Sequence, residues 1–188
     1  MYTGAFPSSI AITPDSKYLY VVNFSDATIS EYSINQSTGA LAALSTGTTG
    51  VCDTNVGSGS DPGNCIYTGN LQPQYSGIGA GNITLSSDGK YAYVIAAGSN
   101  TASAIAEFAV GSTGLLSPLN TGVNNICYSH YQSSGYAPAA NNCILAGENI
   151  YSLSVAPGTD FLYATDASAN TVNVFSISSG TGVLANAQ

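Results

Sequence analysis

The chain has 188 residues, of which 44% are hydrophobic and only 6% are charged, whereas about 25% of the residues in an ordinary soluble domain are charged. The chain has two lysines and no arginine, against ten Asp and Glu residues, which gives a net charge of −8. Because nucleic acids and anionic lipids are bound by clustered cations, the composition argues against both partners. No apolar run approaches the ~20 residues of a membrane-spanning helix, so we expect no membrane insertion.

Three segments of the sequence resemble one another and predict the same pair of strands. They are 10–21, 83–94 and 153–164, spaced by 73 and 70 residues. Each has a short apolar strand, a turn rich in Pro, Asp, Ser and Gly, and an alternating strand that contains Tyr. Such turn residues favour tight hairpins, because Pro fixes φ, Asp bonds nearby backbone and Gly accepts a positive φ. We therefore interpret Asp15, Asp88 and Asp160 as turn residues.

Two further strands follow in every copy. The third strands alternate between apolar and polar residues, as strands packed between neighbouring layers do. They are predicted at 28–34, 104–110 and 171–177. A Thr-Gly turn and a short outer strand come next in each copy. Four short strands in about 40 residues are typical of a β-propeller blade.

The fold class predicted from this repeat is all-β, with three four-stranded antiparallel blades in a single propeller-type domain of residues 1–188. Long insertions rich in Gly, Ser and Asn separate the blades, and we expect them to join the outer strand of one blade to the inner strand of the next. The blades are predicted at about 5–45, 81–119 and 150–188, and the insertions at 46–80 and 120–149.

Each insertion holds two cysteines, and these are Cys52, Cys65, Cys127 and Cys143. Neither pair has the spacing of a zinc motif and the chain has one His, so no metal site is expected. We predict two local disulfides, Cys52–Cys65 and Cys127–Cys143, that staple the insertions. Disulfides of this kind indicate an oxidising compartment, so we expect an extracellular or cell-surface protein.

The segments 14–23 and 87–94 resemble the YVTN-type repeat, which occurs in surface propellers and in the seven-bladed lactonase-like family. In that family a sugar lactone, often phosphorylated, is opened in the central channel. Recognition of phosphate favours Arg or Lys, but both lysines, Lys17 and Lys90, lie at predicted hairpin turns. No catalytic residue is assigned, no cofactor is expected, and the sequence argues against an enzyme more than for one.

Candidate binding residues lie in the second insertion and around the third blade. They are Tyr128, His130, Tyr131, Tyr136, Glu148 and Asp166. The Tyr-rich loop around the single His favours surface recognition, for example of glycans, over general-base catalysis. Glu148 precedes the inner strand of the third blade, near the expected channel. Asp166 stands at a strand end where the first copy has Asn23.

Two other groups of polar residues complete the candidates. Glu31 and Glu107 share one strand position, which Val174 takes in the third copy, and we expect these carboxylates to face solvent or to bond between blades. The glycosylation motif Asn-Xaa-Ser/Thr occurs at three positions. These candidate glycosylation sites are Asn23, Asn35 and Asn82.

Three blades do not close a ring, because propellers use about four to eight. Both ends of the chain fall at equivalent points of the repeat, so we expect the open blade faces to be covered by copies of this chain or by blades of a longer chain. The sequence thus predicts an extracellular structural or adhesive propeller that self-assembles into a surface layer or fibre. The alternatives are a lactonase-like hydrolase and a carbohydrate-binding propeller module.

Overall fold

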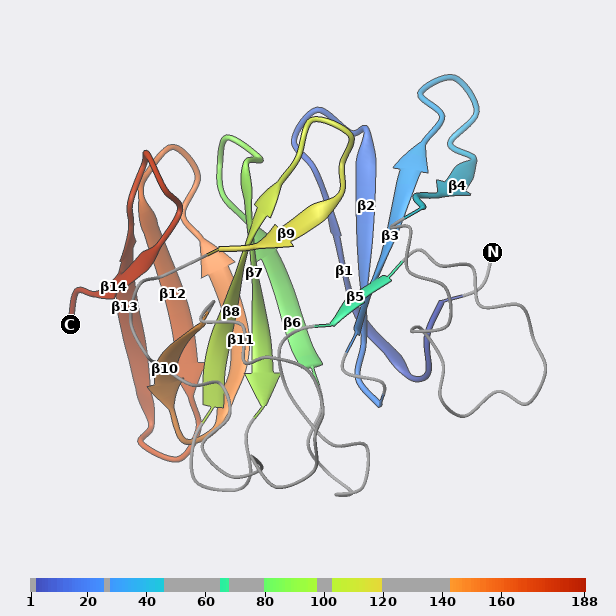
Figure 1. Cartoon of the computed structure of the whole chain (residues 1–188). Coiled ribbons are helices and arrows are strands. Elements are labelled where there is room, and N and C mark those ends of the chain that lie inside the picture. Colours follow the sequence, from blue (N-terminus) through green and yellow to red (C-terminus); the bar gives the residue numbers. More distant parts are fainter. Residues whose placement is uncertain (1–2, 26–27, 46–64, 68–79, 98–102, 120–142) are drawn as a thin grey trace.

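The computed structural model consists of three antiparallel β-sheets that stand side by side in chain order (Figure 1). No helix that could span a membrane occurs among the described residues. The structure describes residues 3–25, 28–45, 65–67, 80–97, 103–119 and 143–188.

The first sheet, blade 1, has five strands in which the first four follow the chain order. A fifth strand, β5, pairs with β3 beside β4. The strands are β1 (Pro7–Ile12), β2 (Tyr18–Asn23), β3 (Thr28–Ile34), β4 (Leu41–Ala43) and β5 (Cys65–Tyr67).

Blade 2 repeats this arrangement, with β7 between β6 and β8, and with both β9 and β10 on the outer edge of β8. Its strands are β6 (Ala80–Leu85), β7 (Tyr91–Ala97), β8 (Ser103–Val110), β9 (Leu116–Pro118) and β10 (Cys143–Gly147).

Blade 3 is the four-stranded sheet that the sequence predicts for every copy. Its strands run in chain order from the inner to the outer edge. They are β11 (Ile150–Val155), β12 (Phe161–Asp166), β13 (Thr171–Ile177) and β14 (Leu184–Asn186).

The additional strands β5 and β10 correct the predicted course of the insertions. β4 pairs with the end of β3 at Tyr32–Ile34, whereas β5 pairs with its beginning at Thr28–Ser30. β9 and β10 divide β8 in the same way. A short strand within each insertion therefore pairs with the third strand of the insertion's own blade, beside the outer strand. The pairing satisfies backbone groups that would otherwise remain on an open sheet edge.

In blades 1 and 2 the hairpin turn between the first two strands is closed by an aspartate, as predicted for Asp15 and Asp88. The Asp15 carboxylate accepts hydrogen bonds from Thr13 Oγ1 at 2.7 Å and from the Lys17 N–H at 3.1 Å. Asp88 makes the same two contacts with Ser86 and Lys90. These bonds hold the turn in place, which explains why Asp recurs there.

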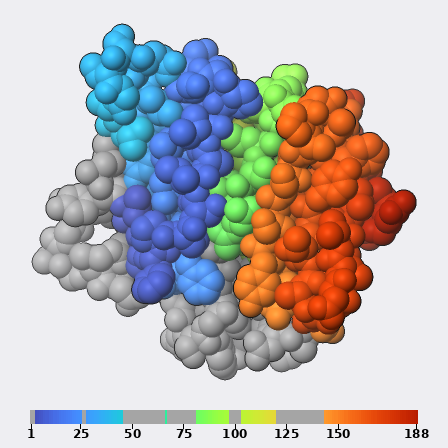
Figure 2. Space-filling view, turned by 180° about the vertical axis from the view of Figure 1, so that it is seen from behind, coloured from blue at the N-terminus to red at the C-terminus, as the bar shows by residue number. Residues whose placement is uncertain are grey.

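The hydrophobic core lies between the sheets, as expected of propeller blades. Apolar side chains of blades 1 and 2 form one buried cluster, which includes Tyr20, Ile29 and Phe108. A second cluster joins blades 2 and 3 and includes Ile105 and Phe175. The space-filling view shows the three blades against one another along their length (Figure 2). Burial between blades thus supplies the main stabilisation.

Candidate functional site

Neighbouring blades meet along two boundaries, which we call seam 1 (blades 1 and 2) and seam 2 (blades 2 and 3). The inner strands make the first contact of each seam. Ser9 Oγ accepts a hydrogen bond from the Ile83 N–H at 3.3 Å, and Asn82 Oδ1 accepts one from the Leu153 N–H at 3.0 Å. Ser9 and Asn82 occupy the same position of the repeat, and Ser152 occupies it in blade 3.

The second strands make the next contact with buried tyrosines. The Tyr20 hydroxyl donates a hydrogen bond to Gly114 O at 2.7 Å across seam 1. The Tyr93 hydroxyl donates to Gly182 O at 2.8 Å across seam 2. Both glycines lie in the turn before the outer strand of the following blade. Tyr163 holds the corresponding position in blade 3.

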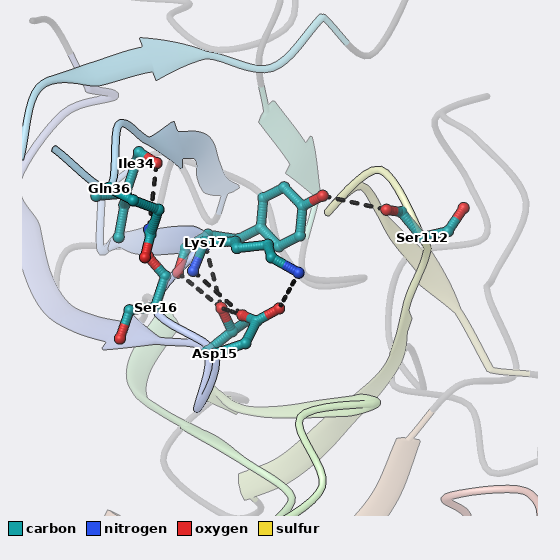
Figure 3. A network of polar contacts seen from close by, with 8 residues as sticks. Asp15, Ser16, Lys17, Ile34, Gln36 and Ser112 are labelled. Atoms are coloured by element: carbon teal, nitrogen blue, oxygen red, sulfur yellow. Dashed lines mark hydrogen bonds and ion pairs between the residues drawn. The ribbon is translucent and has the colours of Figure 1, made fainter.

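A second aromatic ring packs on the same glycine. A Cβ atom added to Gly114 would lie 2.2 Å from Tyr18 Cδ1, and one added to Gly182 would lie 2.1 Å from Tyr91 Cδ1. The φ angles of 83° and 72° also favour glycine. The Tyr18 hydroxyl reaches on to Ser112 O at 3.1 Å, and Figure 3 shows this bond beside the turn of blade 1.

The third strands contribute the glutamates. Glu31 Oε1 accepts a hydrogen bond from the Leu116 N–H at 2.8 Å, and Glu107 Oε2 accepts one from the Leu184 N–H at 3.0 Å. Both glutamates are fully buried. Burial raises the pKa of each carboxyl to about 7, although the backbone hydrogen bond opposes this rise. Of the two predicted placements, bonding between blades is the correct one.

Blade 3 presents the corresponding positions on its outward side, which we call the blade-3 end face. Phe161 and Tyr163 stand where Tyr18 and Tyr20 stand in blade 1, yet they are 42% and 39% exposed. Val172, the counterpart of the buried Ile29, is 59% exposed. The blade-3 end face comprises Ser152, Phe161, Tyr163, Val172 and Val174.

The opposite side of the array, the blade-1 end face, has the complementary features. Ile10 and Ile12 are 59% and 51% exposed, whereas Ile83, the counterpart of Ile10 in blade 2, is buried. A Cβ at Gly39 would meet no atom within 4 Å, unlike one at Gly114.

The two end faces differ in how much apolar surface they expose. On the blade-1 side, the apolar side chains of Leu19, Val21 and Tyr32 are buried, so this side exposes less apolar surface. The blade-3 end face exposes Phe161, Tyr163 and Val172, whereas the blade-1 end face exposes Ile10 and Ile12.

Asp166 and Glu148 meet through the backbone at the end of β12. Asp166 Oδ1 accepts hydrogen bonds from the Ser168 and Ala169 N–H groups at 2.9 and 3.1 Å. Its Oδ2 accepts one from the Glu148 N–H at 3.3 Å. These bonds, led by that from Ala169, lower the pKa of the Asp166 carboxyl. The contacts give Asp166 a structural role in the turn, while Glu148 is exposed.

Several predicted residues lie outside the described part of the chain, so their roles stay predictions. They are Cys52, Cys127, Tyr128, His130, Tyr131 and Tyr136. Cys143 is buried and disulfide-bonded, and its pairing with Cys127 stays a prediction. No three His, Cys, Asp or Glu side chains gather as metal ligands would within the described segments.

The candidate glycosylation sites have different surroundings. Asn23 is buried, and its Nδ2 donates hydrogen bonds to Thr28 Oγ1 and Ser30 Oγ. A glycan at Nδ2 would displace these bonds, and glycosylation of Asn23 stays a prediction. Asn35 is exposed in a turn. Asn82 is half-buried and bonds to both neighbouring inner strands.

The seam contacts were not predicted as a set, although their signal is in the sequence. The Tyr-Xaa-Tyr pattern and the shared Glu position were visible in the repeat. Their partners are backbone groups of the following blade, 77 to 94 residues later in the chain. A backbone partner leaves no trace in residue identity, which is why the pairing could not be inferred.

Comparison with known proteins supports the propeller fold. No protein-family model matches the chain, and no curated protein matches it. A putative 6-phosphogluconolactonase from Bacteroides fragilis superposes with a TM-score of 0.67 at 17% identity, covering 100% of this chain and 39% of that one. The periplasmic gluconolactonase of Pseudomonas aeruginosa gives 0.64 at 16% identity, covering 98% and 39%.

A second putative 6-phosphogluconolactonase, from Bacteroides uniformis, has a TM-score of 0.59 at 20% identity and covers 100% of this chain and 41% of that one. The chain therefore spans about two fifths of the length of these structural neighbours. At these identities the likeness concerns the fold. The chain has the architecture of β-propeller blades.

Proposed function

We propose that this chain works as an open segment of a lactonase-like propeller that binds further propeller blades through its end faces. One observation carries the proposal. The blade-3 end face exposes Ser152, Phe161 and Tyr163, the types of group that hold seams 1 and 2 together. Large exposed apolar surfaces with polar groups at fixed positions are typical of interaction sites.

The further blades can come from a second copy of this chain or from a longer polypeptide. A second copy would offer its Gly39 turn to Tyr163 and Phe161. Val174 of the first copy would lie opposite the Leu41 N–H of the second copy, and its side chain has no acceptor atom. In seam 1 the corresponding Leu116 N–H donates to the Glu31 carboxylate. A boundary between two copies would therefore be weaker than seams 1 and 2.

The test is the mass of the purified chain in solution as a function of concentration, measured by sedimentation equilibrium. Self-association is expected to weaken at least tenfold in Tyr163→Ser. Phe6→Ser is the matched control, because Phe6 is 75% exposed and belongs to neither end face. A wild-type chain that stays monomeric throughout contradicts self-association, and a Tyr163→Ser variant that associates like wild type contradicts binding through this face.

Lactone hydrolysis by the completed propeller is the second candidate, favoured by the names of the structural neighbours. The described residues supply little for a phosphorylated substrate. Lys17 and Lys90 are bound in ion pairs with Asp15 and Asp88 at 3.1 and 3.0 Å. Release of acid from gluconolactone and its 6-phosphate, followed at constant pH, tests this activity. Unchanged turnover in Glu148→Gln would exclude Glu148 as a catalytic residue.

An extracellular structural or adhesive role, including glycan binding, belongs to the same proposal. The disulfide bond of Cys143 supports an oxidising compartment. Cell fractionation with thiol labelling tests this: the cysteines are expected in a non-cytoplasmic fraction and resistant to alkylation. Reduced cysteines in the cytoplasm would contradict the location, and a glycan array without bound glycans would contradict the adhesive role.

A further inference from the structure

The outer edge of β13 is only half covered within the described structure. β14 pairs with Phe175–Ile177. The first half of β13, at Thr171–Asn173, pairs with β12 on its inner side, and no described strand pairs with its outer side. An open edge of this kind presents backbone donors and acceptors to any extended segment.

In blades 1 and 2 the corresponding half of the third strand is covered. β5 pairs Ile66 with Ile29, and β10 pairs Ile144 with Ile105. The two added strands have the same register, and their isoleucines pack against the cores of seams 1 and 2. Val172 occupies the position of Ile29 and Ile105 in blade 3.

The backbone of Val172 faces the open side. The Ile177 N–H donates to Asp160 O, towards β12, and Val174 O accepts from the Ala187 N–H, on the outer side. Backbone groups alternate in direction along an antiparallel strand, so the N–H and C=O of Val172 point outwards like those of Val174. A strand added there would form the same ladder that β5 forms with β3.

A shallow groove lies directly beside this edge. It runs between β10 and β13 and reaches the last residues of the chain. Its lining consists of Leu145, Ala146, Gly147, Asn173, Phe175, Asn186 and Gln188. Leu145 is 55% exposed there. The edge and the groove together offer one surface for an extended segment, with backbone pairing on one side and apolar contact on the other.

We infer that the open edge of β13 binds an extended strand from a further propeller blade, with an apolar residue opposite Val172. The source of the strand rests on the proposed function, while the pairing itself rests on the repeated geometry of β5 and β10. Apolar pairs opposite each other stabilise antiparallel strands. The strand would occupy the edge as the blade that brings it covers the blade-3 end face.

The experiment extends the full chain beyond Gln188 with a flexible Gly-Ser linker followed by the sequence of residues 143–147, with Cys143→Ser in the added copy. Tethering raises the effective concentration of the strand to the millimolar range. Amide hydrogen exchange is read at Val172. The matched control carries the same extension with Ile144→Pro, which removes a backbone donor and the apolar side chain.

The exchange rate of the Val172 amide is expected to fall at least tenfold with the added strand and to stay unchanged in the control. No protection, or equal protection by both extensions, overturns the inference. The outcome is independent of sedimentation: a chain that associates through Tyr163 but shows no protection at Val172 retains the proposed function and loses this strand site. A chain that is protected at Val172 but does not self-associate retains this strand site and loses the self-association expected from the proposed function.

Discussion

Tyr20 and Tyr163 occupy the same position of the repeat in different surroundings, which makes them a matched pair at the residue scale. Tyr20 is fully buried and donates its hydroxyl proton to Gly114 O, whereas Tyr163 is 39% exposed. A buried acceptor that loses its donor retains the cost of its desolvation. The value of the hydroxyl group therefore depends on the presence of the next blade.

The substitution Tyr20→Phe is expected to lower the free energy of unfolding by about 1 kcal/mol, because it leaves Gly114 O buried without this donor. Tyr163→Phe is expected to change it little. Urea denaturation of both variants followed by circular dichroism checks the difference. Equal effects would show that the hydroxyl group of Tyr20 does not stabilise seam 1.

At the scale of the element, the turn before each outer strand has a fixed role. Gly39, Gly114 and Gly182 all have positive φ, at 70°, 83° and 72°. Only the latter two lie under an aromatic ring of the preceding blade. The same turn is thus part of a seam in blades 2 and 3 and part of an end face in blade 1.

Gly114→Ala is expected to destabilise the chain more than Gly39→Ala, by roughly 1–3 kcal/mol. Both variants force Ala into a left-handed conformation, but only the Cβ at position 114 would approach Tyr18 Cδ1 to 2.2 Å. Thermal unfolding of the two proteins at one pH gives the comparison. Similar midpoints would mean that the Tyr18 ring moves away at little cost.

The first three strands of each blade were largely predictable from the sequence, whereas the additional outer strands β5 and β10 were not. Alternation and turn residues place the first three strands of each blade because both signals are local. β5 and β10 lie within the long insertions, and the short segment at Cys65–Tyr67 has no alternation to distinguish it. Pairing with an edge of the preceding strand determines these elements, and that is a tertiary effect.

The candidate site divides in the same way. Asp166 was selected because the repeat gave no reason for an acid there, yet the structure uses it to bind three backbone N–H groups. Glu31 and Glu107 were recognised as a shared position, while Leu116 and Leu184 as their partners were not. Residue type and position were visible in the sequence, whereas contacts with backbone across a seam required the fold.

At the scale of the whole molecule, the seams couple stability to pH. The pKa of Glu31 and of Glu107 is about 7 in the folded chain, against an ordinary value of 4.5, because of burial. Below pH 4.5 both carboxyls are protonated in either state, and their contribution is fully present. Between pH 4.5 and 7 the unfolded chain releases these protons and the folded chain keeps them, so stability falls as the pH rises.

Lowered pKa values act in a different range. The pKa of Asp15 is lowered mainly by the hydrogen bond from Thr13, and that of Asp166 mainly by the bond from the Ala169 N–H. Their stabilisation is present above 3.8, the ordinary value, and is lost only as the pH falls through the lower folded values. They contribute almost no slope between pH 4.5 and 7, so among the described groups with shifted pKa values the two glutamates determine the slope in this interval.

The chain is therefore expected to be less stable at pH 8 than at pH 5, by up to about 3 kcal/mol for each glutamate. Urea unfolding at both pH values measures the difference. Glu31→Gln combined with Glu107→Gln keeps an acceptor oxygen at each seam and removes the titration, so this variant should show a much smaller difference and exceed the wild type at pH 8. A wild-type chain that is equally stable at both pH values, or more stable at pH 8, would show that the carboxyls stay ionised within the seams.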